Sequence, residues 1–529
     1  MNDSTNSRGG GFDMSNLDPS MIDHIEVIRG AASAIYGAEA MGGVINIVTR
    51  SGLDEPGTYV AGAAGAGGQN YLAVNARAAT GEGSFRSAAG ASKLKDGSDA
   101  EGGYLDLSQY TAAARWTIDP SSAINLNVRR SERRSTSLPD DSGGLRLAEI
   151  RTLDQKSGSE TAVSARGTWG YAPMTLNVSG TFYRHLESID SPGVAPGVRS
   201  DIGVPASNSN TDYRRSNGSA NAVIHLGGDN ELAVGAEYQR EQGGNHTVYT
   251  LFGMAIPVDF DLTRNTRSAF AELKWIAARD LTVRAGARYD SIDDNGSQTS
   301  PTLGVRYNLP SIDAALRASY SEGFKPPSFF VLGLPVELGG NPNLRAEHSK
   351  GGSLGYDQRF WDGKASAGLA VFKTKYTDLV TFDNETNQTV NANEVNIYGA
   401  ELEGAIRPTA RLGIQAHFTR LVSHVVDSDE PLRQRPGRRG GVRVTWMPRD
   451  DAQLSWRTEY AAQTFDSSIP TGNLTLPTYL RSDVTCSWLW RKGLSLTLAV
   501  DNVFDKENES YVGAVAPGRR FRASIGVEM

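Results

Sequence analysis

Residues 22–50 read IDHIEVIRGAASAIYGAEAMGGVINIVTR and combine apolar runs, turn glycines and a small-residue segment in one compact unit. Residues 25–28 predict a short strand that ends at Arg29 and Gly30, because four largely apolar residues stop at a turn former. Residues 31–35 predict a turn or two of helix, and residues 44–48 predict a return strand. No other part of the chain combines these features.

The Gly42-Gly43 pair before the return strand permits backbone angles and close approaches that a Cβ would forbid. An ordinary βαβ fragment is an alternative that these local signals leave open. A phosphate-binding loop is excluded, because the spacing from Gly37 to Gly42 is followed by Gly43 where such a loop needs a lysine.

The composition of the whole chain favours a β-barrel in a membrane. The 529 residues include 58 glycines, 8 Trp and 19 Tyr, and the mean hydropathy is −0.38. No run approaches the ~18 apolar residues of a membrane helix, which excludes a helical membrane protein. Strands that alternate lipid-facing and lumen-facing residues average out to a polar sequence, so the barrel fits.

The charged and metal-binding residue types exclude several other classes. The net charge of −7 comes from 53 basic and 60 acidic residues without a basic tract, so nucleic-acid binding is not expected. Cys486 is the only cysteine, which rules out an intramolecular disulfide and a cysteine-based metal site. The seven histidines are scattered, so no metal or other cofactor is predicted.

Segments with strand-like alternation recur from residue 59 to the end of the chain. Counting them gives 22, which predicts an all-β membrane protein, a 22-stranded antiparallel transmembrane β-barrel. The predicted strands begin near residues 59, 69, 84, 107, 122, 160, 173, 216, 231, 267, 281, 302, 314, 351, 364, 397, 412, 441, 452, 480, 494 and 519.

The connections between these segments alternate in length, as they do in a barrel of antiparallel hairpins. Short turns such as residues 119–121, 361–363 and 491–493 are expected at the periplasmic rim together with both chain ends. Long polar stretches are expected outside the cell, at residues 131–159, 185–215, 241–265, 322–350 and 501–518.

The closing strand, residues 520–529, separates two faces. Phe521, Ala523, Ile525, Val527 and Met529 form one face, which we expect to meet lipid, and the residues between them are polar, small or charged. A Lys or Arg at mid-membrane on the lipid face would cost ~2–4 kcal/mol, so this segregation is physically required.

Residues 25–30 and 36–50 resemble the second half of the plug domain of TonB-dependent outer-membrane receptors. Five further runs resemble the same family in order and spacing: SYSEGFKPPS (319–328), GNPNLRAE (340–347), IYGAELEG (397–404), LAVDNVFD (498–505) and GRRF (518–521). The resemblance covers essentially the whole chain. Family members usually end in an aromatic residue, from which Met529 departs.

The resemblance implies a 22-stranded barrel with a partial α/β plug inside, divided into residues 1–52, the C-terminal part of the plug, and residues 53–529, the barrel. It implies a receptor that takes up a scarce bulky nutrient, most readily a ferric siderophore, with cobalamin or another nutrient as the alternative. It also implies a monomer in the bacterial outer membrane whose partners are TonB, outer-membrane lipid, lipopolysaccharide and the barrel assembly machinery. A membrane-embedded hydrolase is the competing class, but no short catalytic motif supports an enzyme.

The first twenty residues are polar and glycine-rich and predict a loop or an unfolded lead-in. Plugs of the family are longer and carry near their start the short box that contacts TonB, which residues 1–50 do not contain. No signal peptide precedes Asp3. We therefore also keep a truncated, non-transporting relic as an expectation for the chain as written.

Arg29 is predicted to lie inside the barrel, where an unpaired charge is costly. Family plug arginines meet barrel glutamates, which points to Glu347, Glu401 and Glu403 as plug–barrel contacts. Glu401 and Glu403 share the polar side of their strand, although glutamates there could simply line a wet channel wall. The residues that carry the plug motif itself are Gly30, Tyr36, Gly37, Gly42, Gly43 and Asn46.

Loop aromatic and basic residues are candidates for binding a small-molecule ligand such as an anionic metal chelate. The alternative is that they pack loops or carry solvated charges. The acidic residues 290–295 and 140–141 are weak candidates for Ca²⁺, because neither shows a full set of ligands. The ligand candidates are Tyr249, Phe252, Phe329, Phe330, Arg433, Arg435, Arg438 and Arg439.

Overall fold

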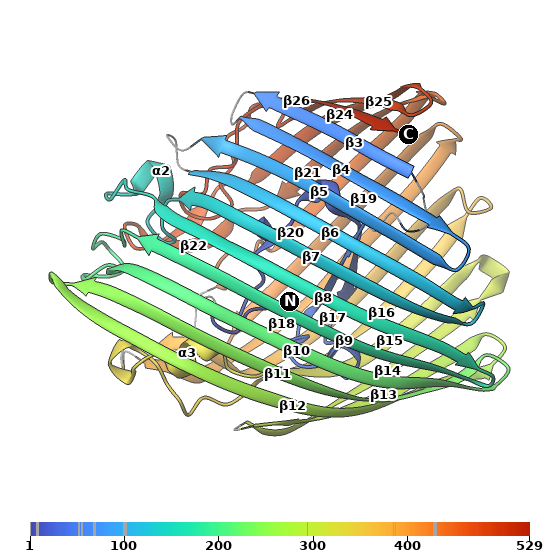
Figure 1. Ribbon diagram of the computed structural model, residues 1–529, viewed down its shortest axis with the longest axis horizontal. Helices are drawn as coiled ribbons and strands as arrows, with labels where there is room; N and C mark the ends of the chain where they lie inside the picture. The colour runs from blue at the N-terminus through green and yellow to red at the C-terminus, as the bar shows by residue number, and fades with distance from the viewer. Residues whose placement is uncertain are drawn as a thin grey trace.

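The computed structural model describes residues 2–6, 10–50, 53, 57–66, 70–98, 103–293, 295–383, 386, 388–426 and 431–529. Within these ranges the chain forms one closed antiparallel barrel with a small sheet inside its lumen (Figure 1). No helix in the same ranges combines the length and apolar content needed to cross a membrane.

The barrel contains 22 strands in the described residues, which confirms the predicted number. Sequence neighbours pair around the wall, and β26 closes it against β3. The strands are β3 (Gly57–Ala66), β4 (Tyr71–Glu82), β5 (Phe85–Ser98), β6 (Gly103–Asp119), β7 (Ser122–Ser137), β8 (Asp154–Tyr171), β9 (Met174–Ser191), β10 (Ala206–Gly227), β11 (Asn230–Leu251), β12 (Met254–Ala278), β13 (Leu281–Ile292), β14 (Gly296–Leu309), β15 (Ala314–Lys325), β16 (Glu347–Phe360), β17 (Ala365–Asp383), β18 (Gln388–Thr409), β19 (Leu412–Val425), β20 (Arg438–Arg449), β21 (Ala452–Ala461), β24 (Tyr479–Arg491), β25 (Leu494–Asp501) and β26 (Arg520–Glu528).

Short turns gather at one rim of the barrel and longer connections at the other (Figure 1). The long-loop rim carries α2 (Gly144–Leu147), α3 (Phe329–Gly333), the 3-10 turn η4 (Val336–Leu338) and a hairpin of β22 (Thr464–Ser468) and β23 (Gly472–Leu476). The short-turn rim carries η3 (Pro310–Ile312) and the C-terminus. Short turns face the periplasm in barrels of this kind, so the long loops face outward.

The strands reach further toward the long loops than predicted, and the predicted loop at residues 241–265 is wrong. Strands β11 and β12 pair from Leu251 and Met254 downward and leave only Phe252 and Gly253 as the turn. The same extension shortens the predicted loops at 131–159 and 185–215. The physical reason is that above the membrane both strand faces meet water or other loops, so the apolar alternation that marks a strand is lost while backbone pairing continues.

Strand β26 confirms the predicted separation of its faces. Phe521 and Ile525 are exposed on the outside of the wall. Arg522 points the other way and pairs with Asp501 of β25, with Nε and Oδ2 2.7 Å apart. The barrel therefore presents apolar side chains to lipid and pairs its charges in the lumen.

The lumen holds residues 2–6 and 10–50 of the segment at the start of the chain. Its two-stranded antiparallel sheet consists of β1 (Ile22–Arg29) and β2 (Gly43–Thr49), connected through α1 (Ser33–Tyr36). Two 3-10 turns, η1 (Met14–Asn16) and η2 (Pro19–Met21), precede the sheet. The predicted division between residues 52 and 53 falls beside residues outside the described ranges and stays a prediction.

Candidate functional site

The hairpin β1–β2 brings the predicted motif residues together. The strands pair antiparallel, with Ile28 opposite Val44 and Arg29 opposite Gly43, so the alternative of a parallel βαβ unit is wrong. Gly43 has a φ of +146°, and a Cβ there would lie 2.4 Å from the carbonyl oxygen of Ile28. Only glycine fits this approach. Asn46 donates from Nδ2 to Glu26 Oε2 across the hairpin at 2.7 Å.

The remaining motif residues surround the hairpin turn. Gly30 follows β1 directly, and Tyr36 ends α1 with a half-exposed ring. Gly37 lies against the guanidinium of Arg288, and Gly42 lies beside the hydroxyl of Tyr376. Both neighbours belong to the barrel wall, so the turn of this segment is where it meets the barrel.

The first twenty residues are not an unfolded lead-in, which corrects that prediction for their described part. Asp13 caps η1 and pairs with Arg133 of β7, and Asn16 donates to Glu160 of β8 at 2.9 Å. Asp3 Oδ2 lies 2.6 Å from Nδ1 of His185. Burial acts to raise the pKa of Asp13, but Arg133 and Ser15 hold it below its usual value. A polar sequence is ordered here because the lumen wall is itself polar.

A buried cluster of charges joins this segment to the barrel near α3, and we name it the Glu39 cluster. It contains Ser4 and Glu39 from the segment, and Arg215, Glu241 and Arg264 from β10, β11 and β12. Arg264 Nε lies 2.9 Å from Glu241 Oε2, and its Nη2 donates to Ser4 Oγ at 3.0 Å. Arg215 Nη1 lies 3.5 Å from Glu39 Oε2. Burial raises the pKa of Glu39, and the charge of Arg215 opposes the shift.

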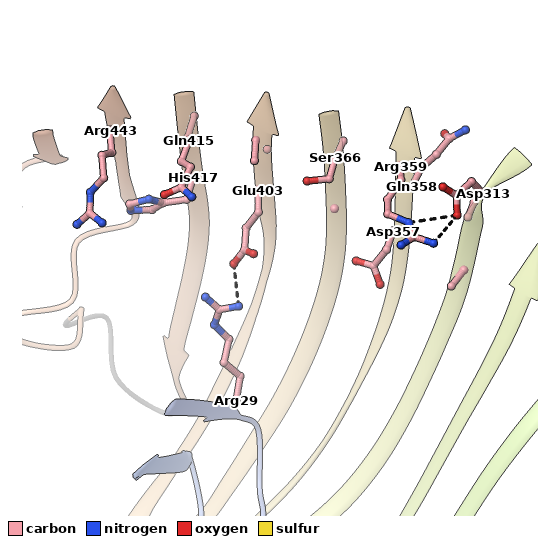
Figure 2. Close-up of a pocket in the computed structure, with 18 of the residues that line it drawn as sticks. Arg29, Asp313, Asp357, Gln358, Arg359, Ser366, Glu403, Gln415, His417 and Arg443 are labelled. Carbon is pink, nitrogen blue, oxygen red and sulfur yellow. Dashed lines mark hydrogen bonds and ion pairs between the residues drawn. The ribbon is translucent and has the colours of Figure 1, made fainter. Parts of the chain in front are cut away.

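Arg29 lies beside two of its three predicted partners, Glu401 and Glu403, and Figure 2 shows its pair with Glu403. Its Nη1 is 2.9 Å from Glu403 Oε1 and 3.3 Å from Glu401 Oε2. The side chains of Arg29 and Glu403 are 62% and 55% exposed, so the pair is solvated. Solvated pairs contribute ~0–1 kcal/mol. Glu347 is not a partner, because it lies in the outer part of the wall and pairs with Lys325 at 3.4 Å.

The Arg29 pair borders a polar space of about 1080 Å³ toward the short-turn rim. Figure 2 shows Gln415, His417 and Arg443 pointing into this space from neighbouring strands. Acidic and basic side chains both line it, and Arg359 pairs with Asp313 at 2.7 Å across its edge. The space is therefore wet and has no single sign of charge.

A second cavity, of about 590 Å³, lies at the long-loop end of the barrel, and we name it the outer cavity. Tyr249 of β11 and Phe330 of α3 line it together with Lys325 and Glu347. Most other lining residues are apolar: Leu251, Ile256, Val331, Leu334, Leu338, Val380 and Phe382. This composition suits a ligand with an apolar or aromatic body.

The other ligand candidates do not reach the outer cavity. Phe329 is only 2% exposed and packs with Tyr183 and Tyr213, so its prediction as a ligand contact is wrong because α3 turns it into the wall. Phe252 is 84% exposed at the tip of the β11–β12 hairpin. Arg435 is exposed and donates to the carbonyl of Gln434 at 3.2 Å.

Arg433 connects loops rather than facing a cavity. It pairs with Asp141 and Asp466 at 3.0 Å each, and Arg199 also pairs with Asp141 at 2.8 Å. Arg438 and Arg439 lie in β20, where register places them on opposite faces of the wall. These contacts support the alternative that basic loop residues serve packing.

The acidic residues predicted as weak Ca²⁺ candidates bind other side chains of the protein. Asp290 lies 2.9 Å from Arg288 Nε and accepts from Ser268 at 2.6 Å, while Asp141 holds the two arginines just described. Within the described residues, no group of three or more His, Cys, Asp and Glu side chains is arranged to hold a metal ion. Residue 294 lies outside the described ranges.

Two family models match the chain. Residues 56–503 match the TonB-dependent receptor-like β-barrel, and residues 1–44 match the TonB-dependent receptor plug domain. Among curated relatives, the vitamin B12 transporter BtuB of Vibrio cholerae is 23% identical over 98% of this chain and 81% of its own length. The iron-regulated outer membrane virulence protein of Vibrio cholerae is 22% identical, with coverages of 99% and 82%.

Solved structures agree on the fold. The pyoverdine outer membrane receptor FpvA from Pseudomonas aeruginosa superimposes with a TM-score of 0.81 at 15% identity, over 97% of this chain and 84% of that one. The siderophore receptor PiuA from Acinetobacter baumannii gives a TM-score of 0.78 at 16% identity, with coverages of 96% and 86%.

Proposed function

The chain belongs to the TonB-dependent receptors of the bacterial outer membrane, and we propose that it captures a ferric siderophore for uptake. Members of this family are receptors and transporters rather than enzymes. The ligand would bind in the outer cavity, with TonB as the energy-supplying partner.

The observation that carries the proposal is that one short segment faces both the outer cavity and the plug. Lys325 and Phe330 line the cavity. At the ends of the same segment, Glu39 N donates to Phe324 O at 2.9 Å and Phe330 N donates to Ser4 O at 3.1 Å. A ligand in the cavity would therefore press on backbone that is hydrogen-bonded directly to the plug.

Arg264 reinforces this connection from the barrel side. Its Nη1 donates to Pro327 O at 2.9 Å, while its Nη2 holds Ser4. The side chain is buried and lies 4.8 Å from the centre of the Phe329 ring. Binding that shifts the 325–330 segment would thus disturb the Glu39 cluster, which is a physical route from ligand to plug.

The chemistry of the outer cavity favours an anionic chelate with aromatic groups. Tyr249 and Phe330 offer ring faces, and Lys325, which also pairs with Glu347 at 3.4 Å, offers a cation among the lining residues. Cobalamin is the second candidate, supported by the curated vitamin B12 transporters that match 98% of the chain. The iron-regulated relative supports the siderophore.

Ligand binding by the purified protein tests the proposal. Quenching of tryptophan fluorescence is measured with a ferric catecholate, a ferric hydroxamate and cyanocobalamin. We expect one ferric chelate to bind, and Tyr249→Ala and Phe330→Ala each to weaken it about tenfold or more, as loss of a buried aromatic anchor does. Phe252→Ala is the control, since Phe252 points into solvent outside the cavity. If only cyanocobalamin binds, the siderophore proposal is wrong and cobalamin becomes the proposed ligand.

Uptake by cells tests the energy coupling. The gene in its native context is placed in a strain without other receptors for the same ligand, and accumulation of the iron-labelled chelate is followed. We expect accumulation to stop when TonB is deleted. Equal accumulation without TonB would contradict the proposed transport.

A further inference from the structure

Four side chains form one corner of the polar space, and we name them the Arg443 cluster: Gln415 and His417 of β19, Arg443 of β20 and Arg457 of β21. The register places them side by side, because Gln415 is directly opposite Arg443 and Arg443 is directly opposite Arg457. His417 is two residues from Gln415 and shares its face of the strand. Figure 2 shows Gln415, His417 and Arg443 pointing into the space. The cluster therefore faces the lumen and not the lipid.

Two members of the cluster have free hydrogen-bond donors. Arg443 and Gln415 are exposed to the lumen, and neither side chain has a hydrogen-bond or ion-pair partner in the described ranges. Arg457 Nε lies 2.7 Å from Glu459 Oε1, and His417 Nε2 lies 3.8 Å from Glu459 Oε2. The guanidinium of Arg443 and the adjacent amide of Gln415 are thus available to an anionic solute.

The carboxylates on either side of the cluster are bound to other arginines. Glu403 is on the neighbouring strand β18 and lies 2.9 Å from Nη1 of Arg29. Asp483 is on the neighbouring strand β24 and lies 2.8 Å from Nε of Arg481. No carboxylate in the described part of the chain forms an ion pair with Arg443. Although the polar space as a whole contains both signs of charge, this corner has an uncompensated positive charge.

Small residues leave room for a solute in front of the cluster. Gly441 lies between His417 and Glu459 in the register. A Cβ there would lie 2.7 Å from Cε1 of His417 and 2.9 Å from either carboxylate oxygen of Glu459. Ala405, on the other side of Gln415, adds only a methyl group to the lining. The long polar side chains are therefore the groups that a solute in this corner meets.

The cluster lies between the outer cavity and the short-turn rim. Arg443 is six residues from Arg449, where β20 ends at that rim. At a rise of ~3.3 Å per residue and a tilt of about 40°, this places Arg443 roughly 15 Å from the rim. The outer cavity lies at the opposite end of the barrel. A solute that leaves the cavity for the periplasm along the side where the plug hairpin faces water would pass the cluster.

We propose that the Arg443 cluster is an inner anion-binding site, which holds the carboxylate groups of a solute while it crosses the lumen. Arg443 donates two parallel hydrogen bonds to one carboxylate, and the amide of Gln415 donates to the same group or the next. A charge-assisted pair of this kind is about twice as strong as a neutral hydrogen bond, so a single one holds an anion without trapping it. That the solute is the anionic chelate of the outer cavity rests on the proposed function, whereas anion binding by the cluster does not.

Isothermal titration calorimetry on the full chain, purified in detergent, tests the site. The probe is tricarballylate, a tricarboxylate, used at low ionic strength because salt screens exposed charges. We expect Arg443→Gln to bind the probe at least about tenfold more weakly than the wild type does. Gln415→Ala, which removes only the amide, should weaken binding about threefold. Tight binding of the neutral triamide of the probe, or wild-type binding by Arg443→Gln, would overturn the proposal.

The matched control is Arg166→Gln. Arg166 of β8 is exposed, shares the inward face of its strand with Glu160 and has no ion-pair partner in the described ranges. It is five residues from the short-turn end of β8 at Tyr171, so its height is close to that of Arg443, but it does not line the polar space. We expect this variant to bind tricarballylate within about twofold of the wild type, because distant sites act independently. Equal weakening of both arginine variants would mean that any lumen arginine binds the probe, which overturns the site.

Folding of every variant is checked by heat-modifiable gel mobility. Arg443 is exposed, so its replacement should not disturb the barrel. If Arg443→Gln nevertheless fails to fold, Gln415→Ala decides in its place, and wild-type binding by that variant would then overturn the proposal.

Two measurements on Arg443→Gln separate this site from the proposed function. Fluorescence quenching by the ferric chelate reports the outer cavity, and we expect its affinity to stay within about twofold, because the cluster is at the other end of the barrel. Accumulation of the same chelate by cells should fall about threefold or more, because a positive lining raises the local concentration of an anion and its rate of passage. Unchanged accumulation would overturn the role in transport. If no ferric chelate binds while tricarballylate still requires Arg443, the proposed ligand is wrong and the inner anion site stands.

Discussion

At the scale of single residues, Gly43 and Arg29 are paired positions of the plug hairpin that differ in how strictly the structure requires their residue type. Gly43 is fixed by sterics, because its backbone angle and the carbonyl of Ile28 leave no room for a side chain. Arg29 is opposite Gly43 in the register, and its mostly exposed side chain pairs with the half-exposed Glu403 and the more buried Glu401. The first position tolerates no substitution, while the second should tolerate several.

We therefore expect Gly43→Ala to open the hairpin. The new Cβ would lie 2.4 Å from Ile28 O at a positive φ, a combination that costs of order 1–3 kcal/mol. Hydrogen exchange of the backbone amides in β1 and β2 measures the opening. Gly42→Ala is the control, since its Cβ would lie 3.5 Å from the Tyr376 hydroxyl. Equal exchange in both variants would show that the close approach does not hold the hairpin.

The Arg29 contacts should contribute little to the stability of the plug. In double-mutant cycles of Arg29→Ala with Glu401→Ala and Glu403→Ala, we expect coupling energies of ~0–1 kcal/mol, because the Arg29 side chain is 62% exposed to solvent in both pairs. The same hydrogen-exchange experiment gives the opening free energies. A coupling of ~3 kcal/mol or more would mean that the pair is desolvated in solution, in contrast to its exposure here.

At the scale of elements, the long connections divide the outer rim into two parts. The β7–β8, β9–β10 and β19–β20 connections meet the β22–β23 hairpin through Asp141, Arg199, Arg433 and Asp466. The tall β11–β12 hairpin and the loop containing α3 enclose the outer cavity instead. One part of the rim is thus tied by ion pairs, and the other is shaped around a cavity.

The ion pairs of Asp141 should make the tied loops sensitive to acid. Burial acts to raise the pKa of Asp141, but Arg199 and Arg433 hold it below the ordinary value of 3.8. An acid with a lowered pKa stabilises the folded loops above pH 3.8 and loses that contribution as the pH falls through its folded pKa. We expect Asp141→Asn to raise amide exchange in residues 464–476 at pH 7. In the wild type, after correction for the intrinsic pH dependence of exchange, the same rise should come only as the pH falls below 3.8. An unchanged rate in the variant would contradict this role.

At the scale of the whole molecule, a polar segment is held inside a barrel whose outer surface is apolar. Inward-facing polar side chains are buried between β6 and β16, at Gln109, Glu160, Gln239, Arg264 and Arg288. On the part of the wall that Figure 2 shows, by contrast, Gln415, His417 and Arg443 are exposed and line the polar space. Arg457 is exposed and lines the same space. The plug segment is therefore fastened to one side of the lumen, and its hairpin faces water on the other.

The closed barrel predicts heat-modifiable behaviour. Because a closed barrel has no free strand edges at which unfolding can begin, the protein should stay folded in SDS until it is boiled. Unboiled and boiled samples should therefore run at different positions on a gel. It should also fractionate with the outer membrane. Solubility in buffer without detergent, or circular dichroism dominated by helix, would contradict the fold.

The sequence by itself determined the number of strands, the short-turn rim and the inward and outward faces of strands such as β26. Each of these depends on local alternation or on turn residues, which are visible in a window of about ten positions. Arg29 near Glu401 and Glu403 could also be predicted, but only with the help of a family resemblance.

Only the tertiary structure decided the height of the hairpins, the place of Phe329 and the membership of the Glu39 cluster. Above the membrane both faces of a strand carry polar residues, so the sequence gives no period to follow there. Ser4 meets Arg264 across 260 residues of chain, and Glu39 meets Arg215 across 176. Each is one of many polar residues that a wet lumen accommodates. Their pairing depends on where the barrel closes, which no local pattern encodes.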